Sequence, residues 1–302
     1  MVPKRQRVGS TVTGIAADCL DWPHTQRPPR ALEPIVRDIF ANDRRVVTLA
    51  DLDAWATGIP PQRIARLLRE RGWLAPMRTR GAWRPPIWYT GNTAGFDELL
   101  ARLRVRPDTP ASIAGHSAME VRQWLKRPTE PTIGMPPGAL VPRCLQGYKL
   151  LRWAPRSPLD SVEGIPVWSP ATLLAYMASW PTKFGFEDVS EWLDLVCEAV
   201  CWDGLMIELD GRPRSVWMKA AFVAWRAGCH QLSSQILGCA PDAGKGPYKF
   251  GIPTRRWGSR TYPEFDVVDY VFTRHWEDPD THFRRWPRDT PSAATTPAPA
   301  CG

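Results

Sequence analysis

The chain of 302 residues carries a net charge of +8, with 43% hydrophobic and 23% charged residues, the balance of a globular protein. No apolar run approaches the roughly 20 residues of a membrane helix, and no apolar core follows the basic N-terminus as in a signal peptide. The seven cysteines are odd in number and irregularly spaced, so we expect reduced thiols and a cytoplasmic location.

The positive charge is concentrated near the N-terminus. Residues 1–90 hold 15 Lys and Arg against 8 Asp and Glu, whereas the remaining 212 residues hold 24 against 23. A local basic excess attracts polyanions, because each neutralised phosphate releases condensed counterions. A solvated surface would explain the charge equally well, so the placement of the arginines has to decide between the two.

The first ninety residues divide into an arm and a helical segment. Residues 1–31 are rich in Arg, Pro and polar residues without periodicity, which favours a flexible basic arm or an over-long translation start. Apolar residues then recur at three-and-four spacing over residues 32–40, which predicts a first helix. Thr48 is followed three residues later by Asp51, the pattern of an N-cap that begins a second helix.

A third helix and a hairpin complete this segment. A turn at residues 57–58 precedes the third helix, which begins near Pro60 and ends at Gly72. Two short strands are expected on either side of a turn at residues 79–82. Three helices followed by a two-stranded ribbon predict a winged helix-turn-helix domain over residues 32–90, and Gly in the short turn between its second and third helices is common in this motif.

The third helix and the ribbon carry the predicted DNA contacts. With Ile64, Leu67 and Leu68 facing inward, the outward side chains of the helix include those that read adenine and guanine edges in the major groove. The ribbon arginines would reach phosphate or the minor groove, and a helix N-terminus also favours an anion, although Thr48 is equally explained as a plain N-cap. The predicted DNA-binding residues are Thr48, Gln62, Arg63, Arg66, Arg69, Arg78, Arg80 and Arg84.

Residues 95–275 predict a larger C-terminal domain of mixed α/β class. A helix is expected near residues 96–103 and a second, rich in small residues, over 111–125. Residues 162–168 suggest a hairpin leading to Ser169, whose side chain would cap the next helix. Strands interleaved among further helices complete the domain. From Glu277 the chain is dominated by Pro, Thr, Ala and charge, so residues 277–302 are expected to form a disordered tail.

The order of several short segments over residues 32–272 resembles the AbiEi family of bacterial antitoxins, including its mycobacterial-type members. No segment is diagnostic alone, and their order is the specific signal. The segments are VVTLADL at 46–52, LLRERGWL at 67–74, RGAW at 80–83, GIPV at 164–167 followed by SP at 169–170, GRPRSVW at 211–217 and PEFDVVD at 263–269.

The resemblance implies a division of labour between the two domains. In such families the N-terminal domain binds inverted repeats in the promoter of its own operon and represses it. The C-terminal domain is tied to neutralising a partner toxin, a nucleotidyltransferase-like enzyme. The resemblance implies no catalytic residue, metal or cofactor for this chain. It also implies no particular oligomeric state on DNA.

A basic loop near the C-terminus is a candidate for partner binding. Arg255, Arg256, Trp257 and Arg260 lie in a Gly-containing stretch that could contact the toxin or nucleic acid. An ordinary surface loop is an equally good interpretation. Tryptophan is enriched at interface hot spots, which makes Trp257 the candidate contact of this loop.

Two other groups of residues suggest catalysis or metal binding. Asp203, Glu208, Asp210 and Lys219 could form a metal-dependent nuclease site, which would make the helical segment a targeting domain, although a turn before a helix explains the Asp-Gly pair more simply. A zinc site is less favoured because the chain has no Cys-x-x-Cys knuckle. Its candidate ligands would be Cys197, Cys201, Cys229, His230 and Cys239.

Overall fold

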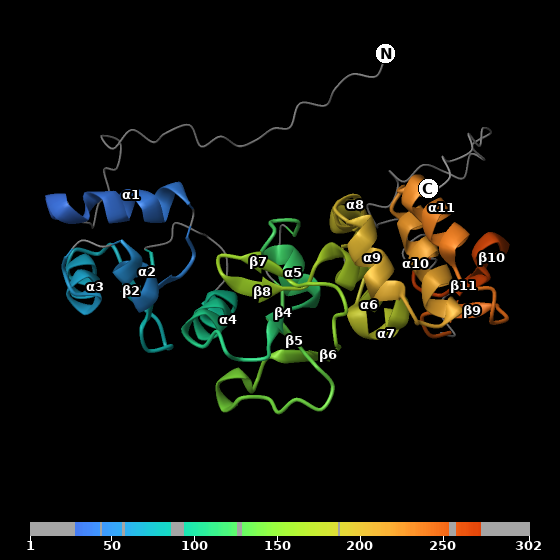
Figure 1. Ribbon diagram of the computed structural model, residues 1–302, viewed down its shortest axis with the longest axis horizontal. Coiled ribbons are helices and arrows are strands. Elements are labelled where there is room, and N and C mark those ends of the chain that lie inside the picture. The colour runs from blue at the N-terminus through green and yellow to red at the C-terminus, as the bar shows by residue number, and fades with distance from the viewer. Residues whose placement is uncertain are drawn as a thin grey trace, which may run out of the picture. The chain divides into compact units, whose positions relative to one another are not determined.

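The computed structural model describes residues 28–42, 44–55, 58–85, 94–125, 129–186, 188–253 and 258–272. Helices and strands alternate along this part of the chain, which confirms the predicted mixed α/β class. Contacts divide the described residues into two compact units (Figure 1). The first runs to Ala154 and includes Leu159–Trp168, and the second comprises Pro155–Pro158 and the residues from Ser169 onward. The predicted arm before residue 28 and the tail after residue 276 lie outside the described residues.

Three helices open the first unit. A 3-10 turn, η2 (Arg30–Leu32), leads into α1 (Glu33–Ala41), and α2 (Leu49–Ala54) and α3 (Pro61–Glu70) follow. Pro34 lies in the first turn of α1, where its missing N–H costs nothing. The apolar faces of these helices meet in one core built on Leu32, Ile35, Ile39, Leu52, Ile64 and Leu68. Trp73 extends this core and packs edge-to-face on Phe40.

A small antiparallel sheet closes this core. It has the strand order β1-β3-β2, from β1 (Val47–Thr48), β2 (Ala75–Pro76) and β3 (Ala82–Arg84). Val47 pairs with Trp83, and Ala75 pairs with Arg84. The chain turns between β2 and β3 at residues 77–81, and Gly81 has a φ of +84°, a value that favours glycine.

The rest of the first unit is built on a mixed five-stranded sheet. Its order is β6-β5-β4-β8-β7, and the pairs β4–β8 and β5–β6 are parallel. The helix α4 (Ala94–Val105) packs against β1, β3 and β8, and α5 (Gly115–Glu120) packs against β5. The strands are β4 (Ser112–Ile113), β5 (Thr132–Met135), β6 (Lys149–Arg152), β7 (Asp160–Val162) and β8 (Ile165–Val167), with η3 (Arg143–Leu145) before β6.

The second unit is mainly helical. The central helix α6 (Pro170–Ser179) is buried from Ala171 to Ala178 and packs against α9 and α10. Ser169 accepts a hydrogen bond from the Thr172 amide, so the predicted N-cap is confirmed. The other helices are α7 (Pro181–Phe184), α8 (Val189–Glu198), α9 (Trp202–Leu209), α10 (Arg214–Arg226) and α11 (His230–Cys239).

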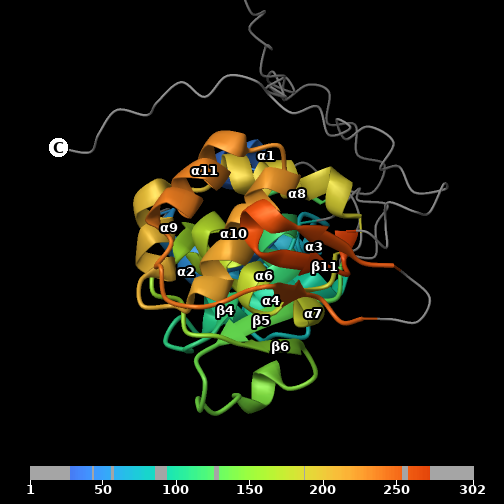
Figure 2. The ribbon, with the colours of Figure 1, turned by 90° about the vertical axis from the view of Figure 1, so that its right-hand side faces the viewer.

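A three-stranded sheet lies against α10 in this unit (Figure 2). It is formed by β9 (Tyr248–Phe250), β10 (Arg260–Tyr262) and β11 (Val267–Asp269), in the order β10-β11-β9. The sheet and α10 share an aromatic core in which Phe222 and Phe250 lie 5.5 Å apart between ring centroids, and Phe250 stacks on Phe272. A short 3-10 turn, η4 (Pro263–Phe265), connects β10 to β11.

Two sequence predictions differ from the structure. Residues 111–125 do not form one helix, because Ser112–Ile113 is strand β4 and only Gly115–Glu120 is helical. The small apolar residues that suggested a helix are buried because β4 pairs with both β5 and β8. The predicted boundary near residues 90–95 falls inside the first unit, and the chain instead passes between units in residues 154–169.

Candidate nucleic-acid interface

The helix α3 separates its apolar and basic residues cleanly. Ile64 and Leu68 are fully buried, Ala65 is buried beside them, and Leu67 is half-buried against the same core. The four predicted base-reading side chains are exposed, namely Gln62, Arg63, Arg66 and Arg69. Successive arginines are three residues apart and therefore lie on neighbouring turns of one broad helix face.

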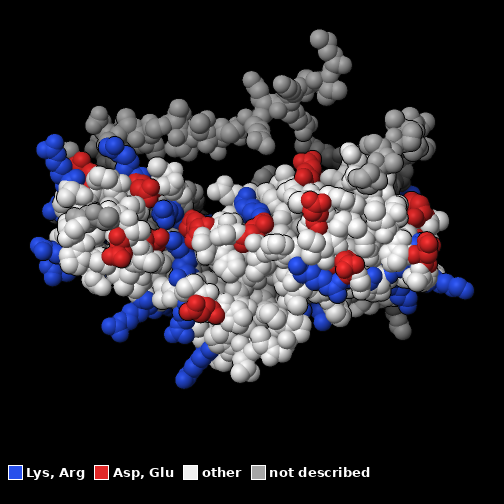
Figure 3. Space-filling view, in the orientation of Figure 1, with Lys and Arg blue, Asp and Glu red and all other residues white. Residues whose placement is uncertain are grey.

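The charges on this face are largely unneutralised. Arg66 forms an ion pair with Glu70 at 3.2 Å, but both side chains are exposed, at 73% and 57%, so solvent screens the pair. Within the described residues, Arg63 and Arg69 have no carboxylate at ion-pair distance. Figure 3 shows basic side chains on the surface around α3. The helix therefore offers exposed guanidinium groups to an incoming anion.

The turn between β2 and β3 carries the next arginines. Arg78 and Arg80 are exposed in this turn, and Arg84 is exposed at the end of β3. The turn is fixed from behind by Glu98 of α4, which accepts hydrogen bonds from the Arg78 amide at 3.2 Å and from the Thr79 hydroxyl at 2.6 Å. These two hydrogen bonds tie the turn to α4, while Arg78 and Arg80 remain exposed.

Thr48 is an N-cap rather than an exposed contact. The residue is 5% exposed, and its hydroxyl accepts from the Asp51 amide and donates to the Asp51 carboxylate at 2.8 Å. The Thr48 amide also donates to that carboxylate at 2.7 Å, which completes a capping box. Its hydroxyl is engaged within the capping box, so we do not assign Thr48 to the DNA-binding surface.

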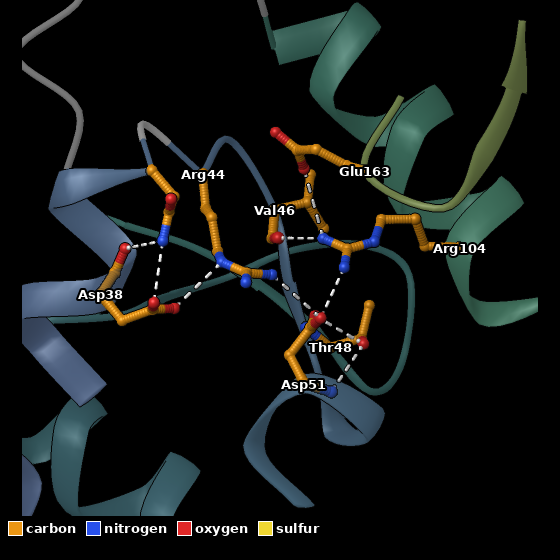
Figure 4. A network of polar contacts seen from close by, with 8 residues as sticks. Asp38, Arg44, Val46, Thr48, Asp51, Arg104 and Glu163 are labelled. Carbon is orange, nitrogen blue, oxygen red and sulfur yellow. Dashed lines mark hydrogen bonds and ion pairs between the residues drawn. The ribbon is translucent and has the colours of Figure 1, made fainter. Parts of the chain in front are cut away.

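Asp51 connects the capping box to a wider network (Figure 4). Its Oδ1 lies 2.5 Å from Arg104 Nη2 of α4 and 3.3 Å from Arg44 Nη1, and Arg44 also pairs with Asp38 of α1 at 3.3 Å. Arg104 Nη1 donates to the Val46 carbonyl at 2.5 Å. The network fixes α2, and α2 packs on α3, so α4 indirectly positions the exposed arginines.

The sequence did not identify Glu98 and Arg104 as positioning residues. Both lie on α4, outside the segment predicted to bind DNA, and each acts on residues at least 19 positions away in the chain. In the sequence they are two of the four charged residues of this helix, and nothing in the sequence sets them apart. Such a residue is ordinarily solvent-exposed, whereas Glu98 and Arg104 are mostly buried here.

The predicted partner-binding loop is described only in part. Arg255, Arg256 and Trp257 lie outside the described residues. Arg260 is exposed on β10, and its guanidinium lies 5.3 Å from the ring centroid of Tyr262. The contact with Tyr262 ties Arg260 to the small sheet, and the role of the loop in partner binding stays a prediction.

The residues of the proposed nuclease site do not form a metal-binding carboxylate cluster in the described chain. Glu208 is fully buried and accepts from the Arg156 and Ser157 amides, from the Ser157 and Thr172 hydroxyls and from Arg212. These donors occupy its carboxylate, so Glu208 holds Pro155–Pro158 against α9. Lys219, the lysine of this alternative, is half-buried, and burial lowers its pKa.

The cysteines of the zinc alternative are not arranged as a ligand set among the described residues. A hydrogen bond with Cys229, together with burial, raises the pKa of Cys197 well above its ordinary value. The same hydrogen bond lowers the pKa of Cys229. Cys201 and Cys239 are exposed.

The comparisons with known proteins give a structural likeness. The chain is similar to the Rv2827c protein from Mycobacterium tuberculosis, known from a crystal structure, with a TM-score of 0.52 and 24% sequence identity over 82% of this chain and 94% of that one. At this identity the likeness concerns the fold. No family model matches the sequence, and no curated protein matches it. Among the described residues, none of the helices has the length and apolar character that a membrane crossing requires.

Proposed function

We propose that residues 32–90 form a winged helix that binds double-stranded DNA with α3 in the major groove. The observation that carries the proposal is the exposed face of α3, on which three arginines and Gln62 lie opposite a fully apolar core. Arginine pairs with guanine edges and glutamine with adenine edges, so the side chains suit base recognition. The element order α1-β1-α2-α3-β2-β3, with the sheet order β1-β3-β2, is consistent with this fold.

The turn between β2 and β3 would act as the wing. Its exposed arginines, Arg78 and Arg80, suit phosphate contact, and Arg84 lies at the base of the same hairpin. Because Glu98 fixes the turn backbone, these side chains would meet the DNA from a rigid support. A preorganised support lowers the conformational entropy lost on binding.

We further propose that the chain is the antitoxin of a two-gene system, which represses its own promoter at inverted repeats and neutralises a nucleotidyltransferase-like toxin. This part rests on the resemblance to the AbiEi family, and the structural likeness to the Mycobacterium tuberculosis protein is compatible with it. The antitoxin activity would belong to the part of the chain after residue 95. No catalytic residue, metal or cofactor enters the proposal.

Footprinting tests the DNA-binding part. The full chain is incubated with the DNA upstream of its own gene and, separately, with unrelated DNA of equal length. We expect two protected half-sites related by inversion in the upstream DNA, lost as the salt concentration rises. Equal, unlocalised protection of both fragments would overturn the proposal of sequence-specific repression.

Growth measurements test the antitoxin part. The gene next to this one is expressed alone, and then together with the full chain under a separate promoter that the chain does not bind. We expect growth arrest in the first case and rescue in the second. Rescue should persist in a chain with Arg63→Ala, Arg66→Ala and Arg69→Ala, because toxin neutralisation is assigned to other residues. A neighbouring gene without toxicity would contradict the antitoxin proposal.

A further inference from the structure

A basic pocket lies beside the β2–β3 turn in the first unit. It has a volume of about 380 Å³ and lies between this turn, the C-terminal half of α4 and η3. Figure 3 shows basic side chains gathered over this part of the unit. The residues that line the pocket are Arg78, Thr79, Arg80, Glu98, Arg102, Val105, Arg106, Arg143 and Cys144.

The lining combines five arginines with one carboxylate, so the pocket is strongly positive. Glu98 is 9% exposed, and both of its oxygens are occupied, by Thr79 and Arg102 on one side and by the Arg78 amide on the other. The carboxylate therefore neutralises only part of the charge. Within the described chain, Arg78, Arg80 and Arg143 are exposed and have no carboxylate at ion-pair distance.

The Arg102 side chain lines this pocket, and its guanidinium is fixed by three contacts. Its Nε donates to Glu98 at 3.3 Å, its Nη1 donates to the Cys144 carbonyl, and its guanidinium lies 5.4 Å from the ring centroid of Tyr148. These contacts use two of the five N–H donors of an arginine and fix the plane of the group. The remaining donors belong to a side chain that is already ordered. Binding an anion therefore costs little additional side-chain entropy.

We infer that this pocket binds a small polyphosphate anion, of the class of inorganic triphosphate or a nucleoside triphosphate. Arginine is the side chain best suited to phosphate, because its planar fork donates two parallel hydrogen bonds to phosphate oxygens. The volume lies within the range of small-molecule pockets. A recessed site suits a compact anion better than a duplex, whose phosphates follow a convex surface.

The site is separate from α3 but shares Arg78 and Arg80 with the proposed wing. Three lining arginines lie outside the wing, and of these Arg102 contacts Glu98, whereas Arg106, directly after α4, and Arg143 in η3 are exposed and do not contact it. Substituting these two leaves the wing and the Glu98 contacts unchanged. A variant with these two substitutions therefore tests the pocket while the proposed DNA-binding residues stay unchanged.

The test is calorimetric titration of the full chain, without DNA, with sodium tripolyphosphate, with ATP and with adenosine. We expect saturable one-to-one binding of the two polyphosphates, at least tenfold weaker in the variant with Arg106→Ala and Arg143→Ala. The matched control carries Arg37→Ala and Lys245→Ala, two exposed cations outside the pocket, and should bind within twofold of the wild type. Similar affinities for tripolyphosphate and ATP would show that the pocket recognises the phosphates alone. A higher affinity for ATP would show that it also recognises the nucleoside.

Three outcomes would overturn the inference. The first is an absence of saturable polyphosphate binding. The second is an equal loss of affinity in the control variant, which would indicate general charge attraction. The third is a loss of DNA affinity in the variant with Arg106→Ala and Arg143→Ala, measured in a separate DNA titration, while its polyphosphate affinity is unchanged. That result would make the pocket an extension of the DNA surface. Because the titration contains no DNA, its failure leaves the proposed DNA binding by α3 untouched.

Discussion

Arg104 of α4 lies 2.5 Å from Asp51 of α2, and the two side chains are only 10% and 12% exposed. The same Asp51 carboxylate accepts from Thr48 in the capping box that begins α2 (Figure 4). One buried ion pair therefore couples the start of α2 to a helix that follows it by some forty residues. This relationship explains why the described residues before and after position 90 belong to one compact unit.

The Arg104–Asp51 pair should contribute strongly to stability. In Arg104→Ala, a mostly buried Asp51 loses its closest cation and the Val46 carbonyl loses a donor. We expect the free energy of unfolding to fall by about 3 kcal/mol, as for other broken buried pairs. Denaturant unfolding checks this, with Arg66→Ala as the exposed control that should change stability by less than about 0.5 kcal/mol. Equal effects of the two substitutions would show that the pair has no special role.

Glu208 should be the most sensitive carboxylate of the second unit. Glu208→Ala leaves Arg212, two backbone amides and two hydroxyls without their buried acceptor. We expect a loss of about 4 kcal/mol in the free energy of unfolding. The measurement is denaturant unfolding combined with hydrogen exchange of residues 202–212. Glu198→Ala, at an exposed position of α8, is the control, and a comparable loss there would refute this role for Glu208.

Gly134 of β5 should not tolerate a side chain. A Cβ at this position would lie 2.4 Å from Nε1 of the fully buried Trp168, so Gly134→Ala overpacks the sheet. We expect a thermal destabilisation equivalent to about 1–3 kcal/mol. Gly238→Ala on α11 meets no atom within 4 Å and should leave stability unchanged or raise it slightly. A neutral Gly134→Ala would mean that Trp168 can move aside.

Glu120 should make the free energy of unfolding depend on pH, with a larger contribution at low pH. Burial raises the pKa of this carboxyl above its ordinary value of 4.5, against the opposing effects of Thr129 and Arg45. Its contribution to stability is therefore complete below pH 4.5 and is lost as the pH rises through the raised pKa. The unfolding free energy of the wild type minus that of Glu120→Gln should be larger at pH 4 than at pH 7. A difference that grows with pH would contradict this assignment.

Local patterns in the sequence predicted the helices that begin with clear signals. Thr48 and Ser169 cap the helices that they were expected to cap, and Gly72 follows the end of α3. The exposure of Gln62, Arg63, Arg66 and Arg69 also follows from the phase of α3 alone. Such features depend on residues within one or two turns, so a single sequence contains them.

Long-range pairing could not be predicted in the same way. Ser112–Ile113 forms a strand because β5 and β8 lie on both sides of it, and nothing within residues 111–125 reveals these partners. The contacts of Glu98 with the β2–β3 turn and of Arg104 with Asp51 likewise join positions far apart in the chain. These contacts join the segments on either side of residue 90 in one unit, where the sequence predicted a boundary.

The affinity ratio between the DNA upstream of this gene and a scrambled duplex of equal length tests the central claim most directly. Fluorescence anisotropy would give this ratio for the wild type, for Arg63→Ala/Arg66→Ala/Arg69→Ala and for Arg78→Ala/Arg80→Ala. A control with Arg37→Ala, Lys245→Ala and Lys249→Ala removes three exposed charges elsewhere.

We predict that the α3 variant loses the preference, by about tenfold or more, because base contacts are removed. The variant of the turn should weaken binding to both duplexes and make its salt dependence shallower, since phosphate contacts carry no sequence information. The control should retain the wild-type ratio. An α3 variant that keeps the full preference for the upstream DNA would contradict the assignment of α3 as the recognition helix.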